Sequence, residues 1–149
     1  MPDDASSPFA GRGSSQDIES GLKLTPKFDA AGLLPAVASD AESGEVLMLA
    51  WMNAEALART IETGEAHFFS RSRARLWRKG EESGNVMVVV ELRTDCDQDA
   101  VWLRVRMGGA AKACHTGAWS CFYRRVPLGQ EPGAQTRLEA ADNHARPDA

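Results

Sequence analysis

The sequence predicts a compact, single-domain α+β fold, rich in β-structure, with about six short strands and one main helix. Several short segments alternate apolar and polar residues, and one stretch repeats apolar residues at helical spacing. The 149 residues are 43% hydrophobic and 26% charged, which is enough to bury a core without disulfides. We expect the domain over residues 26–126, between loose tails at 1–25 and 127–149.

The first predicted elements are a hairpin and the main helix. Apolar runs at 33–38 and 45–52 are joined by the turn-forming stretch 40–44, which favours a β-hairpin. Asn53 then caps a helix that Gly64 ends in the left-handed conformation. The apolar residues of this helix recur at helical spacing: Ala54, Leu57, Ala58 and Ile61.

The second half of the domain is predicted to be mostly strands. Residues 65–70 form a short strand candidate, and the basic, Gly- and Ser-containing stretch 71–84 is predicted to be a loop. Strands are expected at 86–94 and 100–107, where Val and Leu dominate and the alternation is clear. A last strand is expected within 119–126.

Composition and charge argue against several classes of protein. The net charge of −4 does not suit a protein that coats nucleic acid, so no nucleic-acid partner is expected. No stretch approaches the roughly 20 apolar residues that span a bilayer, and the acidic N-terminus lacks the pattern of a signal peptide. The three cysteines are few and odd in number, so we expect a cytoplasmic protein with free thiols and no membrane partner.

Three alternating carboxylates, Asp95, Asp97 and Asp99, lie between the strands predicted at 86–94 and 100–107. In an extended segment they would share one side, and Cys96 would face the other. Crowded carboxylates repel one another unless a cation neutralises them, and hard oxygen ligands suit Mg²⁺. The alternative is a solvated acidic turn with no bound ion.

The three thiols of Cys96, Cys114 and Cys121 are soft ligands that suit Zn²⁺. Three protein ligands leave zinc an open position, where it activates water, so the pattern favours a hydrolase. The alternative is three structural core cysteines. His115 follows a candidate ligand and is predicted to be a general base, with a fourth ligand or an orienting group as alternatives. His67 is expected to be structural.

A basic stretch after residue 70 is predicted to bind phosphate. Arg71, Arg73 and Lys79 supply the cationic donors that phosphate prefers, and Trp77 offers a flat face for a base or sugar. Ser83 lies in the following turn, where backbone groups can approach a ligand closely. The alternative is a solvated surface loop.

Seven short motifs, in order along residues 33–125, point to one known family. They lie at residues 50–57, 63–65, 69–73, 76–85, 95–100, 113–117 and 120–122. Together they resemble phosphoribosyl-AMP cyclohydrolase. The stretch 108–113 looks slightly longer than usual for that family, and the tail after residue 126 is too short for the pyrophosphohydrolase domain that many of its members carry.

The resemblance implies the third step of L-histidine biosynthesis, in which water opens the adenine ring of 1-(5-phosphoribosyl)-AMP between N1 and C6. The product is the phosphoribosyl-formimino-aminoimidazole carboxamide ribonucleotide. By this resemblance the three cysteines bind zinc and the three aspartates bind magnesium. It also implies an intertwined cytoplasmic homodimer, in which Cys96 meets Cys114 and Cys121 of the partner subunit.

Three other functions remain open at this point. A nucleic-acid-binding module with a structural zinc would use the basic stretch, and gel shifts that weaken steeply with salt would reveal it. A thiol redox protein would keep its activity in the presence of chelators, although the sequence has no Cys-x-x-Cys. An adenine-type deaminase would release ammonia, whereas ring opening releases none.

Overall fold

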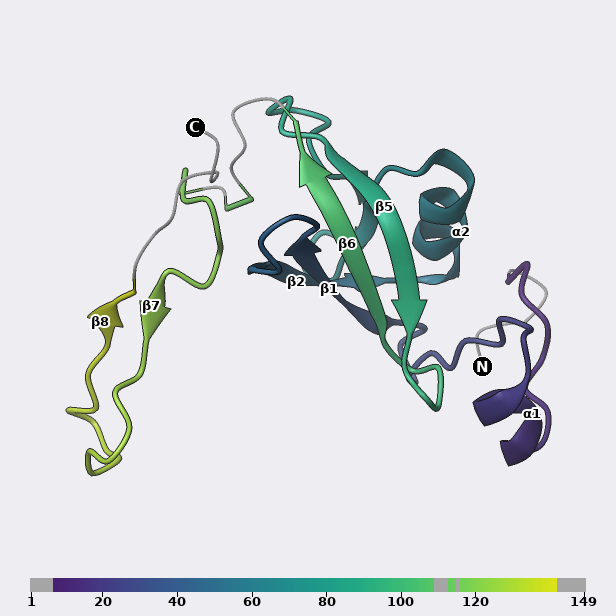
Figure 1. Cartoon of the computed structure of the whole chain (residues 1–149), viewed down its shortest axis with the longest axis horizontal. Coiled ribbons are helices and arrows are strands. Elements are labelled where there is room, and N and C mark those ends of the chain that lie inside the picture. Colours follow the sequence, from purple (N-terminus) through teal and green to yellow (C-terminus); the bar gives the residue numbers. More distant parts are fainter. Residues whose placement is uncertain (1–6, 109–112, 115, 142–149) are drawn as a thin grey trace.

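The computed structural model describes residues 7–108, 113–114 and 116–141. Its centre is a four-stranded sheet in the order β2-β1-β6-β5, seen in Figure 1. The strands are β1 (Leu34–Asp40), β2 (Val46–Met52), β5 (Met87–Thr94) and β6 (Val101–Met107). The β1–β2 and β5–β6 pairs are antiparallel, whereas β1 and β6 run parallel in the middle of the sheet.

The main helix, α2 (Ala54–Thr63), forms where the sequence predicts it. The Asn53 side chain accepts a hydrogen bond from the amide of Ala56 at 2.8 Å, and Gly64 ends the helix at φ 74°. Leu57 is fully buried, whereas Ile61, which the periodicity places on the same face, is 51% exposed. The helix therefore turns a narrower apolar face to the core than the sequence suggests.

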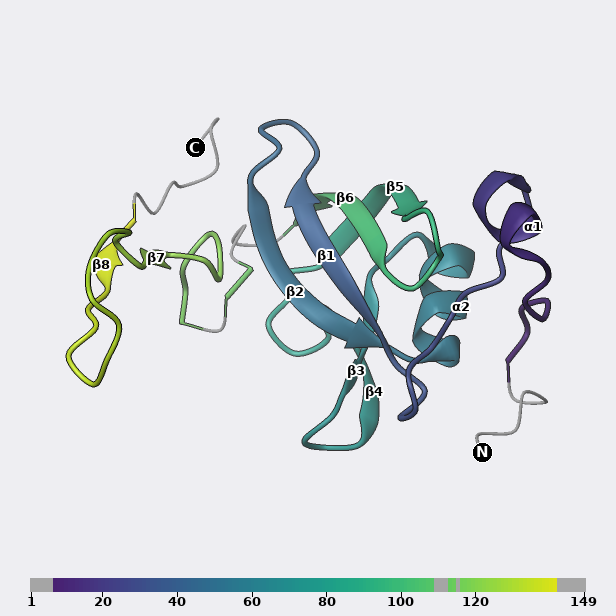
Figure 2. The same ribbon diagram turned by 90° about the horizontal axis from the view of Figure 1, so that it is seen from below.

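A second hairpin completes the core. It consists of β3 (His67–Ser70) and β4 (Arg75–Arg78), which pair antiparallel. Phe68 is fully buried in the same apolar cluster as the inner face of the sheet and α2, and its ring lies 5.1 Å from that of Trp77. Figure 2 shows this hairpin projecting below the main sheet. The prediction that 71–84 is all loop is therefore wrong for residues 75–78.

The expected strand at 119–126 is also largely wrong. Only Arg124–Arg125 is extended (β7), and it pairs with Glu139–Ala140 (β8) in a hairpin at one side of the main body (Figures 1 and 2). Trp119 and Ser120 are instead buried without strand structure. In the described part of the chain, six strands have four or more residues, but they are not the six that the sequence predicts.

The segment before the sheet is more structured than the sequence suggests. Residues Ser15–Ser20 form a short helix, α1, which Ser14 and Asp17 cap reciprocally. Phe9, Leu24 and Phe28 pack against the core, so this segment follows the domain surface. The sequence predicts neither the helix α1 nor this packing against the core.

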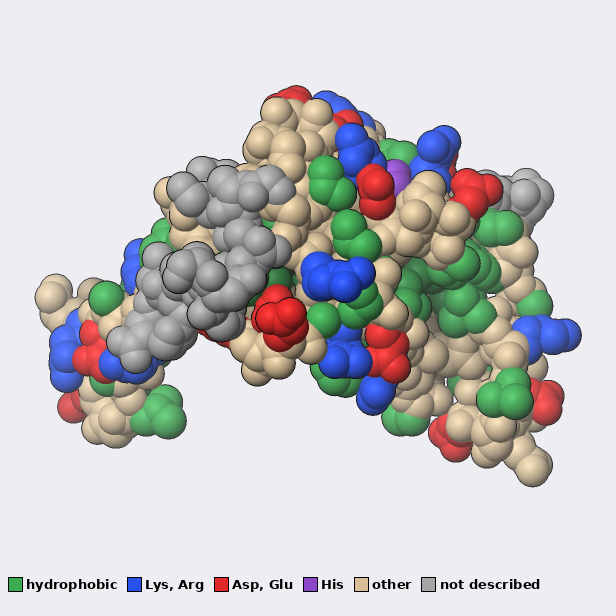
Figure 3. All heavy atoms as spheres, turned by 45° about the horizontal axis from the view of Figure 1, so that its top comes forward, with side chains coloured by type: hydrophobic (Ala, Val, Ile, Leu, Met, Phe, Trp, Pro, Cys, Tyr) green, Lys and Arg blue, Asp and Glu red, His purple; other side chains and the backbone are tan. Residues whose placement is uncertain are grey.

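The outer face of the sheet, opposite α2, carries exposed apolar side chains. They are Val46, Leu49, Val88 and Trp102, which are 38–52% exposed. Cross-strand pairing places Trp102 beside Arg93, whose guanidinium lies 5.2 Å from the indole ring. Figure 3 shows the mixture of apolar and charged side chains on this side of the molecule. Among the described residues, no helix has the length and apolar character that a membrane span requires.

The contrast within α2 gives a test of the fold. Replacing Leu57 by Ala should lower the free energy of unfolding by about 2–5 kcal/mol, because it leaves a cavity in the core. Replacing Ile61 by Ala on the exposed side should cost less than about 1 kcal/mol. Urea unfolding of both variants measures the difference. Equal losses would show that Ile61 also faces the core.

Candidate functional site

The three predicted carboxylates gather at the loop between β5 and β6. Their oxygens lie within 4.8 Å of one another. They meet because the loop is a tight turn and not an extended segment. The amide of Gln98 donates to the carbonyl of Asp95 at 3.1 Å, and the amide of Asp99 donates to Oδ1 of Asp95 at 3.0 Å. The sequence thus predicts the grouping of Asp95, Asp97 and Asp99 but gives the wrong reason for it.

The loop concentrates negative charge. Burial pushes the pKa of Asp95 upward, but hydrogen bonds from the Asp99 side chain and from the amides of Asp99 and Ala100 outweigh it and leave that pKa below its usual value. The pKa of Asp99 is raised, because hydrogen bonding with the Asp95 and Asp97 side chains, followed by burial and their negative charge, disfavours its ionised form. Three hard oxygen donors at this spacing fit Mg²⁺.

A second group forms around Cys114 and Cys121, whose thiols lie near enough for each to shift the pKa of the other. A tight turn between them provides the geometry, since the amide of Cys114 donates to the carbonyl of Ala118 at 3.2 Å. The amide of Cys121 donates to the carbonyl of Leu47 at 2.7 Å, which fixes it to the start of β2. These two soft donors are partly accessible and fit zinc.

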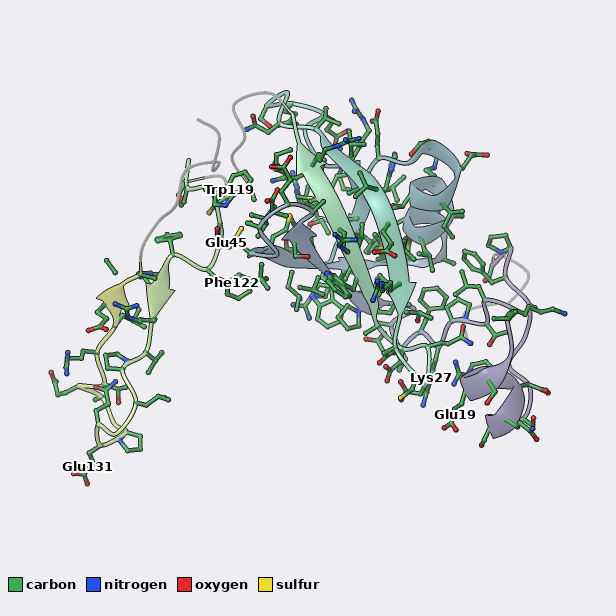
Figure 4. All side chains as sticks on the ribbon, in the orientation of Figure 1. Glu19, Lys27, Glu45, Trp119, Phe122 and Glu131 are labelled. Atoms are coloured by element: carbon green, nitrogen blue, oxygen red, sulfur yellow. The ribbon has the colours of Figure 1, made fainter. Side chains whose placement is uncertain are left out.

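Two partly buried hydrogen bonds fix the segment between these cysteines. The indole Nε1 of Trp119 donates to the carboxylate of Glu45 at 3.0 Å, a pair labelled in Figure 4. The hydroxyl of Ser120 donates to the carbonyl of Val46 at 2.8 Å. Because Glu45 and Val46 lie at the turn before β2 and at its start, the thiol pair is attached to the edge strand of the sheet.

The electrostatics of the thiol pair are uneven. Burial of the sulfur, followed by the neighbouring Cys114, raises the pKa of Cys121 to about 11, although the residue as a whole is exposed. Burial also opposes ionisation of Cys114, but hydrogen bonds from Thr116 outweigh it and lower that pKa. The Thr116 hydroxyl donates to the Cys114 sulfur at 3.0 Å. Sequence reasoning missed Thr116, although it stands in the Cys-His-Thr-Gly motif.

Lys79 lies with the thiol pair. Its ammonium donates to the carbonyl of Ala113, and its backbone amide donates to the carbonyl of Ala66 at 3.0 Å. Burial lowers the pKa of Lys79, and the nearby sulfurs of Cys121 and Cys114 oppose that change. The Lys79 ammonium therefore lies beside Cys114 and Cys121, the two candidate metal ligands, where it can also bind an anionic ligand.

Of the other predicted substrate residues, Trp77 lies beside Lys79, whereas no contact between described residues joins Arg71, Arg73 or Ser83 to it. Arg71 and Arg73 are exposed at the β3–β4 turn, and the Arg71 guanidinium lies 4.5 Å from the Trp51 ring centroid. Trp77 is half-buried on β4, with the Lys79 ammonium 5.9 Å from its ring. Ser83 is exposed in the turn after β4 and accepts a hydrogen bond from the amide of Asn85.

Within one chain the third cysteine is far from the other two. Cys96 lies in the acidic loop before β6, whereas Cys114 follows the other end of that strand. The seven residues of β6 span about 20 Å at about 3.3 Å per residue. Figure 4 shows this separation: Lys27 marks the end of the sheet that carries the acidic loop, and Trp119 lies toward the other end.

The two histidines considered in the sequence analysis differ in what the structure shows. His115 lies outside the described residues. His67 is buried, and its Nδ1 lies 2.8 Å from the carbonyl oxygen of Glu65, while its amide donates to the hydroxyl of Thr60. These contacts give His67 the structural role that the sequence analysis expects.

The fold and the two clusters define the class of protein. It is a small β-rich domain that carries a group of carboxylate oxygens at one end of its sheet and a pair of thiols toward the other end. A sequence model of the family described as phosphoribosyl-AMP cyclohydrolase matches residues 48–123. These residues include both clusters. The chain therefore belongs to the phosphoribosyl-AMP cyclohydrolase family.

Relatives in several bacteria carry the same name, phosphoribosyl-AMP cyclohydrolase. One from Rhizorhabdus wittichii is 68% identical over 111 residues, covering 74% of this chain and 88% of the relative. One from Rhodopseudomonas palustris strain BisB18 is 62% identical over 121 residues, covering 81% and 82%. Another, from strain TIE-1 of that species, is 57% identical over 145 residues, covering 97% and 92%. The similarity thus extends into both terminal segments.

The positions of the three cysteines in the fold predict which thiols link within one chain. Mild oxidation of metal-free protein should join Cys114 to Cys121, because these two thiols lie near enough to shift each other's pKa. Peptide mapping by mass spectrometry identifies the linkage, and denaturing gels without reductant separate links within a chain from links between chains. A dominant link from Cys96 to Cys114 within one chain would contradict the described geometry.

Proposed function

We propose that this chain catalyses hydrolysis of the N1–C6 bond in the adenine ring of 1-(5-phosphoribosyl)-AMP, the third step of L-histidine biosynthesis. The observation that carries the proposal is the thiol pair of Cys114 and Cys121, with Lys79 beside it, in a member of this family. The names of the relatives supply the substrate and the reaction class.

Zinc is the proposed ion at the sulfur site, with Cys96, Cys114 and Cys121 as its ligands. The donor set supports this assignment because two soft thiols already lie within reach of each other and remain accessible. Magnesium is the proposed ion at Asp95, Asp97 and Asp99, where three hard oxygens crowd together. When bound, zinc would supply Lewis-acid activation of water.

A homodimer follows from these assignments. The length of β6 keeps Cys96 away from Cys114 and Cys121 of its own chain, so a three-sulfur site needs Cys96 from a second copy. The outer face of the sheet offers exposed apolar side chains that association can bury, among them Leu49 and Trp102. Each dimer would then hold two equivalent sulfur sites.

In the proposed reaction a water oxygen bonds to C6 of the purine, the C6–N1 bond breaks, and a proton reaches N1. His115 is proposed to take the proton from the attacking water, since neutral imidazole has a suitable pKa. N1 carries the phosphoribosyl group, so C6 is already electrophilic and the protein has mainly to orient water against it. No ammonia leaves, which separates this reaction from deamination.

The remaining residues are assigned to substrate binding. The exposed guanidinium groups of Arg71 and Arg73 are placed to meet a phosphate from solvent. Lys79 lies beside the thiol pair and is proposed to hold an anionic part of the substrate close to the reacting ring. Trp77 is proposed to pack against the base or sugar, and Ser83 to line the turn that follows.

Replacing Cys114 by Ser tests the proposal most simply. Loss of a soft ligand should lower turnover by at least about 100-fold while the circular dichroism spectrum stays unchanged. The ultraviolet absorbance of the purine in 1-(5-phosphoribosyl)-AMP follows the reaction directly. Leu128→Ser is a matched control, because Leu128 is 95% exposed on the C-terminal hairpin. Near-normal turnover in Cys114→Ser would refute the sulfur site.

A further inference from the structure

The acidic loop contains one buried polar side chain, that of Gln98, which is only 4% exposed. Its Oε1 accepts a hydrogen bond from the amide of Thr25 at 2.8 Å. Its Nε2 donates to the carbonyl of Ile18 at 2.9 Å and lies 3.5 Å from that of Lys23. Its own carbonyl accepts from the amide of Lys27 at 2.7 Å. The side-chain oxygen, the side-chain nitrogen and the backbone carbonyl of Gln98 therefore all form hydrogen bonds with the N-terminal segment.

The backbone of Gln98 is unusual as well. Its φ of 57° lies in the left-handed region, which glycine and asparagine adopt more easily than glutamine does. If the turn were the only requirement at this position, glycine or asparagine would be more favourable than glutamine. The presence of glutamine here is explained by what its longer side chain reaches, since asparagine is one methylene shorter.

The N-terminal segment is held by contacts that do not involve Gln98. The guanidinium of Arg12 donates to the carbonyl of Thr25 at 2.8 Å, and Thr25 itself is buried. Leu24 and Phe28, on either side of Thr25, pack against the core. The segment is therefore a fixed support to which the loop is attached.

We propose that Gln98 is a positioning residue: it fastens the acidic loop to residues 18–27 and so presets the carboxylates of Asp95, Asp97 and Asp99 for a divalent cation. Like charges that face one another would otherwise spread the loop before the ion arrives. A loop that is already closed loses less freedom when the ion binds. This inference rests on the magnesium site under the proposed function.

Two variants of the full chain test the role of the side chain. Gln98→Glu keeps its size and an oxygen toward Thr25 but replaces the donor that meets the carbonyls of Ile18 and Lys23. Gln98→Asn keeps the amide and suits the left-handed backbone, yet it is too short to reach the same partners. Gln130→Glu is the matched control, because the Gln130 side chain donates to the carbonyls of Pro127 and Arg137 far along the C-terminal hairpin.

Hydrogen exchange of metal-free protein and calorimetric titration with Mg²⁺ are the two readouts. In both Gln98 variants the amides of 18–27 and 95–100 should exchange together about tenfold faster, while those of β1 and β6 stay protected. The affinity for Mg²⁺ should fall on the order of tenfold, as for loss of a group that orients metal ligands. Gln130→Glu should change neither readout.

Three results would overturn the inference: unchanged exchange at 95–100, unchanged Mg²⁺ affinity, or equally faster exchange throughout β1 and β6, which would make Gln98 a general stabiliser of the fold. Failure of the magnesium assignment gives a different pattern. In that case the wild-type chain and Asp97→Asn would take up Mg²⁺ equally poorly, while exchange of the metal-free chain would still show whether Gln98 holds the loop.

Discussion

The length of a single strand sets the arrangement of every candidate site in this protein. β6 pairs with β1 on one side and β5 on the other, so it is fixed along its whole length at the middle of the sheet. The acidic loop precedes it and the thiol pair follows it. About 20 Å of paired strand separates the two loops within one chain, and for this reason we propose that a site with sulfur from both ends uses two chains.

The two ends of the sheet are supported in different ways. Toward the thiol pair, the chain is attached to β2 through side chains of the turn that carries the cysteines, as in the contact of Trp119 with Glu45. At the acidic end, the loop is attached through Gln98 to a segment that precedes Gln98 in the chain by more than seventy residues. In both cases buried or partly buried hydrogen bonds, and not regular secondary structure, fix the candidate functional loop.

The sequence was informative where local chemistry decides the conformation. Asn53 and Gly64 bound the main helix as predicted, because capping depends on neighbours a few residues away. Predictions from the sequence were wrong where contacts between residues far apart in the chain decide the local conformation. Residues 75–78 lie in a stretch predicted to be a loop from its basic, Gly- and Ser-containing composition, yet Leu76 and Trp77 pair with β3 and pack on the core. Trp119 lies in a segment predicted to be a strand. Its indole instead donates a hydrogen bond to Glu45, and the residue is buried outside any strand.

The candidate site shows the same division. The spacing of the three aspartates predicted that they would act together, but a turn brings them together instead of an extended strand. The family resemblance implied that Cys114 and Cys121 belong to one site, whereas the hydrogen bond from Thr116 and the position of Lys79 depend on the fold. Gln98 gave no signal by composition, since its role depends on partners at Ile18 and Thr25.

Subunit complementation tests the shared sulfur site most directly. Cys96→Ser and Cys114→Ser chains are each expected to be inactive, and they are mixed in equal amounts, dissociated and reassembled. A heterodimer would regain one intact site, with Cys96 from one chain and Cys114 and Cys121 from the other, so activity should return to about a quarter of the wild-type value. Activity that stays at the level of the separate variants would contradict a site built from two chains.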